Sequence, residues 1–242
     1  MRTDMHDHVV TAGGAVVTYE VRGDGPGLVL VPGGTRAGRH YHAMAGQLAE
    51  EFTVHVADRR GAAAGRGPGG RLDERPVAEA CGRGFCGEGM GHTLEDDCAD
   101  LGALIAETGA DLLFGHGYGG MVALETALRH PVRGLVLYEP AAGPGPRVTA
   151  GRPRGFGRAY TLSRHAEALV RSSIERYRGI KAPMLLLTGE RSPAHLRRAA
   201  ELLRAAVPGS CLTAFPGVGH NAPDQEDPVR VARALAAFLR SV

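Results

Sequence analysis

The chain has 242 residues, 43% of them hydrophobic, which is enough for one sizeable core and predicts a single domain. Its formal net charge is +2 and no block of like charge stands out, so nucleic-acid binding is not expected. No stretch approaches the ~18 apolar residues of a membrane span, and the polar start of the chain does not resemble a secretion signal. A cytoplasmic protein without membrane contact is therefore expected.

Hydrophobic patterns predict alternating strands and helices along the chain. Strands are expected at residues 17–21, 28–31, 53–57, 111–114, 132–138, 184–188 and 212–215. Helices are expected at residues 42–52, after the hydroxyl cap Thr93, and at 121–128, 194–206 and 229–239. The helix after Thr93 should bury Leu101, Leu104 and Ile105. This alternation is typical of an α/β fold with a mostly parallel central sheet and helices on both faces.

Two segments do not fit the alternation. Residues 61–91 contain ten glycines in 31 residues, which predicts a long irregular loop that either folds over a pocket or is disordered. Residues 141–180 are expected to form a short helical lid, inserted between core segments 1–140 and 181–242.

Residues 115–120, Gly-His-Gly-Tyr-Gly-Gly, have the pattern of a tight strand-to-helix turn. In a nucleophile elbow, with the pattern small-x-nucleophile-x-small, the middle residue is presented above the sheet. Here the middle residue is Gly117, which has no nucleophilic group. Taken alone, such a hexamer is more often a structural turn, and G-x-G also occurs in dinucleotide-binding loops. Its place between a buried strand and a helix favours the elbow.

With these elements in this order, the chain resembles the α/β-hydrolase superfamily over nearly its whole length. The resemblance implies that the loop Pro32-Gly33-Gly34-Thr35 supplies one oxyanion-hole amide, from Gly34, and that Tyr118 supplies the second. It also implies that His220, in the loop after the last strand, is the catalytic histidine.

The position of the acid that would orient His220 departs from the usual family pattern. Ser192 occupies the position where the family usually has an Asp, and Glu190 is adjacent but displaced. Glu139 ends the preceding strand, where some members of the superfamily place the acid. Glu139 is the favoured partner, since its carboxylate would fix the tautomer of His220 and leave the other ring nitrogen as a base.

Other residues near these loops are candidates for the pocket. Gly33 and Thr35 belong to the oxyanion loop, His40 and His42 follow it, and His116 precedes the elbow tip. For His40 and His42 a structural role is favoured over a place in the pocket, and packing beneath the elbow is the expectation for His116.

No metal or cofactor is expected, because the histidines lack metal-ligand spacing with carboxylates and no phosphate-binding loop is present. The four cysteines show no C-x-x-C spacing and are expected to be plain thiols. They are Cys81, Cys86, Cys98 and Cys211.

These features predict an enzyme that acts on a small organic substrate through the His-Glu dyad and backbone oxyanion hole, without a covalent intermediate. Activation of water would give hydrolysis, whereas abstraction of a substrate proton would give a lyase, cyclase, decarboxylase or isomerase. The Tyr-Glu-Pro and Gly-Glu-x-Ser-Pro sequences resemble small bacterial hydrolases and suggest secondary metabolism. The alternatives are an inactive ligand-binding pseudo-hydrolase, or a glycine engineered at position 117 in place of serine.

The expected lid is basic. It carries eight arginines against two glutamates, a local balance of 8 − 2 = +6. The arginines are Arg147, Arg152, Arg154, Arg158, Arg164, Arg171, Arg176 and Arg178, and the glutamates are Glu167 and Glu175. These charges are either solvated surface or attract an anionic partner, which would be a carboxylate substrate or a carrier-protein-tethered intermediate.

Overall fold

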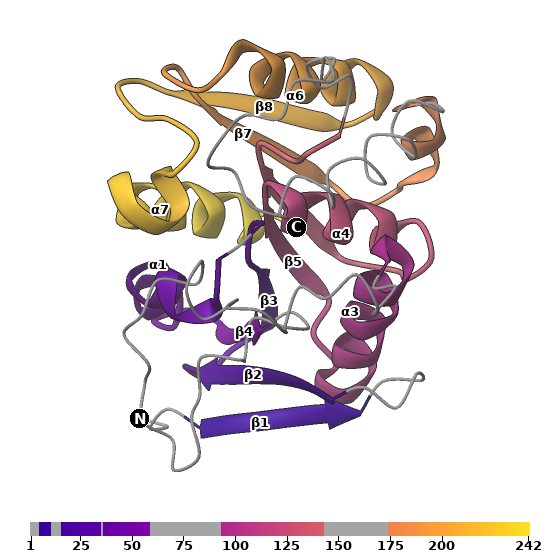
Figure 1. Ribbon diagram of the computed structural model, residues 1–242, viewed down its shortest axis with the longest axis vertical. Helices are drawn as coiled ribbons and strands as arrows, with labels where there is room; N and C mark the ends of the chain where they lie inside the picture. Colours follow the sequence, from indigo (N-terminus) through magenta and orange to yellow (C-terminus); the bar gives the residue numbers. More distant parts are fainter. Residues whose placement is uncertain (1–4, 11–15, 35, 59–92, 143–173) are drawn as a thin grey trace, which may run out of the picture.

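The computed structural model describes residues 5–10, 16–34, 36–58, 93–142 and 174–242. They form one eight-stranded sheet with the order β1-β2-β4-β3-β5-β6-β7-β8 (Figure 1). The strands are β1 (Met5–Val10), β2 (Val16–Arg22), β3 (Gly27–Val31), β4 (Thr53–Asp58), β5 (Leu112–His116), β6 (Gly134–Tyr138), β7 (Met184–Gly189) and β8 (Ser210–Phe215). Strands β1 and β2 pair antiparallel and so do β2 and β4, whereas the remaining pairs are parallel.

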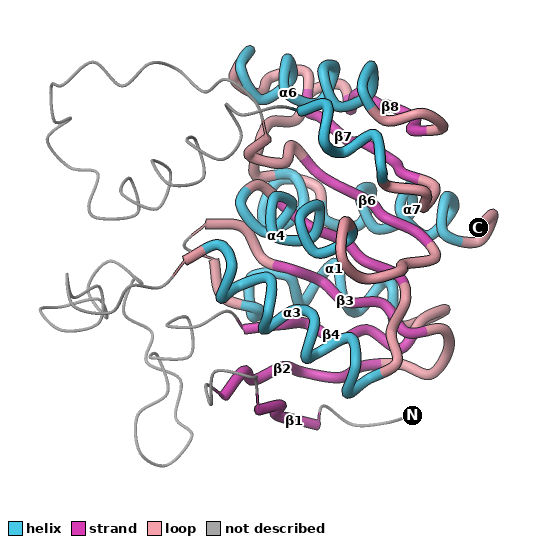
Figure 2. The backbone as a smooth tube through the Cα atoms, turned by 90° about the vertical axis from the view of Figure 1, so that its right-hand side faces the viewer, coloured by secondary structure: helices cyan, strands magenta, loops and turns pink. Residues whose placement is uncertain are grey.

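Helices cover both faces of the sheet, as Figures 1 and 2 show. They are η1 (Gly38–Tyr41), α1 (His42–Leu48), α3 (Leu94–Thr108), α4 (Tyr118–Ala127), η3 (Ile174–Gly179), α6 (Ala194–Ala206), η4 (Ala222–Glu226) and α7 (Pro228–Leu239). Alternate residues of each strand face opposite sides. Leu113 of β5 belongs to the core under α3, α4 and α6, and its neighbours Leu112 and Phe114 belong to the core under α1 and α7.

Helix α3 shows how local sequence sets the ends of an element. The Thr93 hydroxyl accepts a hydrogen bond from the Asp96 amide, and the Asp96 carboxylate accepts one from the Thr93 amide at 2.8 Å. This reciprocal pair satisfies two amides of the first turn. The helix ends at Thr108 and is followed by Gly109, whose φ of 67° suits a left-handed cap. The expected cap at Thr93 is confirmed, and Leu101 and Leu104 are buried as expected, whereas Ile105 is only half-buried.

The main differences from the expected elements lie at their ends. Strand β1 was not expected, because its sequence MHDHVV mixes polar and apolar residues. Helix α4 begins at Tyr118 rather than at 121, since its first turn contains two glycines that weaken the helical pattern. Helix α1 ends at Leu48 rather than at 52.

The glycine-rich segment 61–91 lies outside the described residues, as does most of the expected lid. The described end of the lid segment is η3, which packs against α4. The Tyr177 hydroxyl donates to Glu125 Oε1 at 2.5 Å, and Arg176 Nη2 donates to Glu125 Oε2 at 2.9 Å. Glu125 is buried, so these contacts neutralise its carboxylate and fix η3 on the helix that follows the elbow.

Candidate functional site

Gly117 forms the turn between β5 and α4, with φ 54° and ψ −115°. Residues other than glycine rarely adopt a positive φ. The turn is held by the end of β6, because Gly117 N donates to Tyr138 O and Gly117 O accepts from Ala141 N, both at 2.9 Å. The elbow therefore lies beside the carboxyl end of β6, where Glu139 follows.

The glycines around this turn allow close approach of three backbone segments. A Cβ atom on Gly115 would overlap Gly120 Cα, and one on Gly119 would collide with the Val31 carbonyl oxygen at the end of β3. Gly117 differs. A Cβ atom there would lie 3.3 Å from both Cε1 and Nε2 of His220, with no other described atom beyond its chain neighbours within 4 Å. The elbow tip therefore faces the imidazole.

The imidazole of His220 is paired with Glu139. His220 Nδ1 lies 2.7 Å from Glu139 Oε2, and Glu139 Oε1 accepts from the Gly189 amide at 2.8 Å. The Glu139 side chain is fully buried, whereas 36% of the His220 side chain is exposed. Because a carboxylate only accepts hydrogen bonds, Nδ1 carries the proton and Nε2, the atom that faces Gly117, is left unprotonated in the neutral ring.

Glu139 is also the one described non-glycine residue with a positive φ, at 45°. Such backbone conformations cost about 1–3 kcal/mol and cluster at functional sites. Of the other residues considered for the acid, Glu190 is exposed. Ser192 is buried, and its hydroxyl has no hydrogen-bond partner among the described residues.

A second histidine, His116, lies under the first. Its ring is buried, and its centroid is 4.6 Å from that of His220. His116 Nε2 is 2.8 Å from the His220 carbonyl oxygen, and Nδ1 is 2.6 Å from the Tyr41 hydroxyl. Burial lowers the pKa of His116 to about 3, so this ring is neutral at pH 7. The expected place of His116 beneath the elbow is the one observed.

The two residues expected to supply oxyanion amides lie in the expected loops. Gly34 follows β3 with φ 28°, and Tyr118 is the first residue of α4, at the end where helices present amides to anions. The Tyr118 hydroxyl donates to Asp97 Oδ2 of α3 at 2.8 Å. Their role as oxyanion donors stays a prediction. Thr35 lies outside the described residues.

Arg36 connects the oxyanion loop to the segment after His220. Its Nε is 2.8 Å from Asp224 Oδ2, and its Nη2 is 3.5 Å from Asn221 Oδ1. The Asp224 side chain is fully buried, and desolvation raises the pKa of its carboxyl group. Neither Arg36 nor Asp224 was expected at the site.

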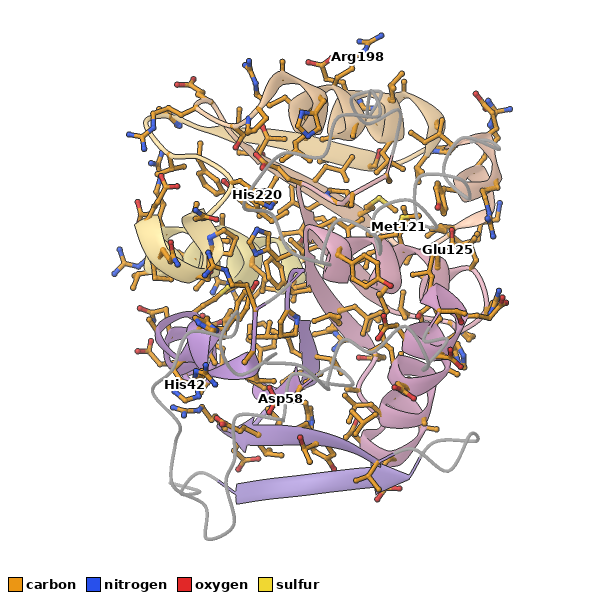
Figure 3. All side chains as sticks on the ribbon, viewed as in Figure 1. His42, Asp58, Met121, Glu125, Arg198 and His220 are labelled. Atoms are coloured by element: carbon orange, nitrogen blue, oxygen red, sulfur yellow. The ribbon has the colours of Figure 1, made fainter. Side chains whose placement is uncertain are left out.

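The other candidate histidines contact different partners. His40 Nδ1 lies 3.0 Å from Ala37 O, within its own turn. His42 Nε2 lies 2.8 Å from Glu20 Oε2 of β2. Figure 3 shows His42 at the start of α1, well separated from His220. His42 was a candidate for the pocket, with a structural role as the favoured interpretation; its contact with a carboxylate on β2 agrees with the structural role.

Within the described ranges, no three His, Cys, Asp or Glu side chains are arranged to hold a metal ion. No helix in those ranges is long and apolar enough to cross a membrane.

A family model described as "Alpha/beta hydrolase family" matches residues 28–234. The uncharacterized hydrolase YraK of Bacillus subtilis is 33% identical over 129 residues, which are 52% of this chain but only 42% of YraK.

Similar solved structures include an alpha/beta hydrolase from Sphaerobacter thermophilus, with a TM-score of 0.69 and 21% identity over 96% of this chain and 100% of that one. An esterase from Exiguobacterium antarcticum has a TM-score of 0.71 and 16% identity over 98% of this chain and 100% of that one. At these identities the structures show the fold alone. The expected α/β-hydrolase fold with its mostly parallel sheet is confirmed.

Proposed function

The chain belongs to the alpha/beta hydrolase family, and on that premise we propose that it is a hydrolase-like enzyme working without a covalent intermediate. The observation that carries this proposal is the position of His220 Nε2, 3.3 Å from where a side chain at position 117 would begin. A glycine there offers no atom that could bond to a substrate. The base that would activate a nucleophile nevertheless stands beside it, held by Glu139.

The proposed chemistry follows from the hydrogen bond between His220 Nδ1 and Glu139, which leaves His220 Nε2 as the base. His220 Nε2 takes a proton from a water molecule or from the substrate, and the Glu139 carboxylate stabilises the imidazolium that forms. In hydrolysis, the resulting hydroxide adds to a carbonyl carbon, negative charge develops on the carbonyl oxygen, and His220 returns its proton to the leaving group. The amides of Gly34 and Tyr118 would stabilise that oxygen, at about 3 kcal/mol for each good donor.

When the proton comes from the substrate, the same groups would support lyase, cyclase, decarboxylase or isomerase chemistry. The substrate is then an organic molecule whose anion is an enolate or alkoxide. We favour hydrolysis, since the relative YraK is called a hydrolase. The scope of substrates, including a role in secondary metabolism, is part of the same proposal.

The test uses p-nitrophenyl butyrate, a lactone and a thioester as probes, with the wild type, His220→Ala and Glu139→Gln. We expect turnover that depends on both residues, and an unchanged intact mass of the protein during turnover. An acyl adduct, or full activity of His220→Ala, would contradict the proposal. Saturable binding of a probe without any turnover would favour the ligand-binding alternative.

An anionic or carrier-tethered substrate remains part of the proposal. Of the eight lid arginines only Arg176 and Arg178 are described, and they pair with Glu125 and Glu175. Electrostatic attraction of an anionic substrate would therefore depend on the arginines of residues 147–171. Once a substrate is known, kcat/KM should fall with ionic strength in the wild type and less so when Arg152, Arg154 and Arg158 are replaced by Gln. A flat response in both proteins would assign these arginines to solvated surface.

A further inference from the structure

Tyr41, which has no part in the proposed chemistry, contacts the oxyanion loop and the end of β5. It is the last residue of η1 and is fully buried. Its hydroxyl lies 3.0 Å from the Gly33 amide and 2.6 Å from His116 Nδ1. A buried hydroxyl that bonds two polar groups from different segments joins them more rigidly than packing alone.

The Gly33 amide and the His220 carbonyl oxygen stand at the two ends of this series of hydrogen bonds. They fix the direction of each bond between them. His116 Nε2 faces the His220 carbonyl oxygen, which only accepts, so Nε2 carries the ring proton. His116 Nδ1 must then accept, and the Tyr41 hydroxyl donates to it. The oxygen of Tyr41 in turn accepts from the Gly33 amide, which only donates. One tautomer of His116 therefore satisfies all four groups.

These hydrogen bonds connect the oxyanion loop with the His220 loop through β5. Gly33 precedes the proposed oxyanion amide of Gly34, and the His220 carbonyl belongs to the same residue as the proposed base. His116 stands between them, next to the elbow tip at Gly117. A side chain at Gly33 would lie 3.0 Å from the His116 carbonyl oxygen, which shows how closely the loop rests on the strand.

We propose that Tyr41 and His116 are positioning residues that hold the Gly33–Gly34 amides and the His220 imidazole in fixed relation. The inference rests on the proposed function, because it assigns to this network the alignment of a donor with a base. Neither residue touches the reacting atoms. Misplacement of catalytic groups by about 1 Å can cost about 100-fold in rate, so loss of the network should lower kcat rather than raise KM.

The variants separate the two ends of the network. Tyr41→Phe removes the hydroxyl. His116→Asn keeps an acceptor near Nδ1, for Tyr41, and His116→Gln keeps a donor near Nε2, for the His220 carbonyl. Tyr177→Phe is the matched control, since it also removes a buried tyrosine hydroxyl but one bonded to Glu125, outside this network.

The first readout is nuclear magnetic resonance, which needs no substrate. In the wild type we expect the Nε2–H tautomer of His116 and slow hydrogen exchange of the Gly33 amide. Tyr41→Phe and His116→Gln should speed that exchange at least 10-fold. His116→Asn should instead keep Gly33 protected while the His220 imidazole signals broaden. Tyr177→Phe should change neither signal.

The second readout is the turnover of p-nitrophenyl butyrate that depends on His220. We expect Tyr41→Phe to lower kcat about 10–100-fold with KM within about 3-fold and the acid limb of the pH profile unmoved. Unchanged Gly33 exchange in Tyr41→Phe would overturn the inference, as would an Nδ1–H tautomer of His116. If no such turnover exists, the proposed function fails, and the exchange measurements still decide whether the network holds the two loops.

Discussion

Replacing Gly117 by alanine tests the geometry of the elbow without adding any reactive group. At φ 54° and ψ −115°, an L-residue is in a sparsely populated region that costs about 1–3 kcal/mol. The new Cβ would also lie 3.3 Å from two atoms of His220, so the imidazole or the turn must move by a few tenths of an ångström. We expect the free energy of unfolding to fall by about 2 kcal/mol.

For a chain of this size, a loss of that magnitude lowers the unfolding midpoint by about 4–8 °C. The assay is thermal and urea unfolding of the wild type, Gly117→Ala and a control, Gly46→Ala. Gly46 lies in α1, and a Cβ atom there would have no neighbour within 4 Å. The control should therefore gain about 0.5–1 kcal/mol. A Gly117→Ala protein as stable as the wild type would refute the assigned backbone strain.

Gly117→Ser carries the same Cβ and adds only a hydroxyl, so its comparison with Gly117→Ala isolates the nucleophile. We expect no rapid turnover of simple activated esters by the serine variant, because the proposed chemistry places water or substrate in that volume. Fast turnover with an acyl adduct would instead show a site that lacked nothing but the serine.

Three further changes have expected outcomes. Glu139→Gln should lower His220-dependent turnover on the order of 10²–10⁴-fold, measured as kcat, since the neutral amide no longer stabilises the imidazolium. Because burial lowers the pKa of His116 from 6.5 to about 3, the unfolded chain binds this proton more tightly. The associated stability is present above about pH 6.5 and is lost as the pH falls towards 3. Between pH 7.5 and 5, the free energy of unfolding measured in urea should fall by about 2 kcal/mol more in the wild type than in His116→Gln. Equal decreases in the two proteins would contradict the lowered pKa of His116. Arg36→Met should cost about 3–5 kcal/mol by leaving the buried Asp224 unpaired, and adding Asp224→Leu should restore part of it; equal stability of the two variants would contradict the argument.

The central strands were predictable from the sequence because they are buried on both faces. Strands β5, β6 and β7 have every residue buried, and each reads as a continuous apolar run. Strand β1 was missed for the opposite reason, since an edge strand with polar residues at positions 6–8 shows no such run. Helix α4 was placed late, because glycines required by the close backbone packing of the elbow weaken its first turn.

The contact between His220 and Glu139 was predictable from the order of the loops, whereas contacts between residues without a local sequence pattern were not. His220 and Glu139 were expected from their places after β8 and β6, and their side chains are in contact. Tyr41 and Arg36 were not expected, since their partners lie 75 and 185 residues away and neither belongs to a local pattern. Only the fold brings those pairs together.

The ends of β5 and β6 carry the same backbone feature with different residues. Gly117 and Glu139 both have a positive φ, 54° and 45°, and the two turns are hydrogen-bonded to each other through Tyr138 and Ala141. Glycine adopts this conformation without strain, whereas Glu139 does so at a cost of about 1–3 kcal/mol. That cost is offset by the hydrogen bonds that hold its carboxylate against Gly189 and His220. Strain is thus retained where a charged side chain is held against the imidazole and is absent at the elbow tip, where glycine accepts the same backbone conformation.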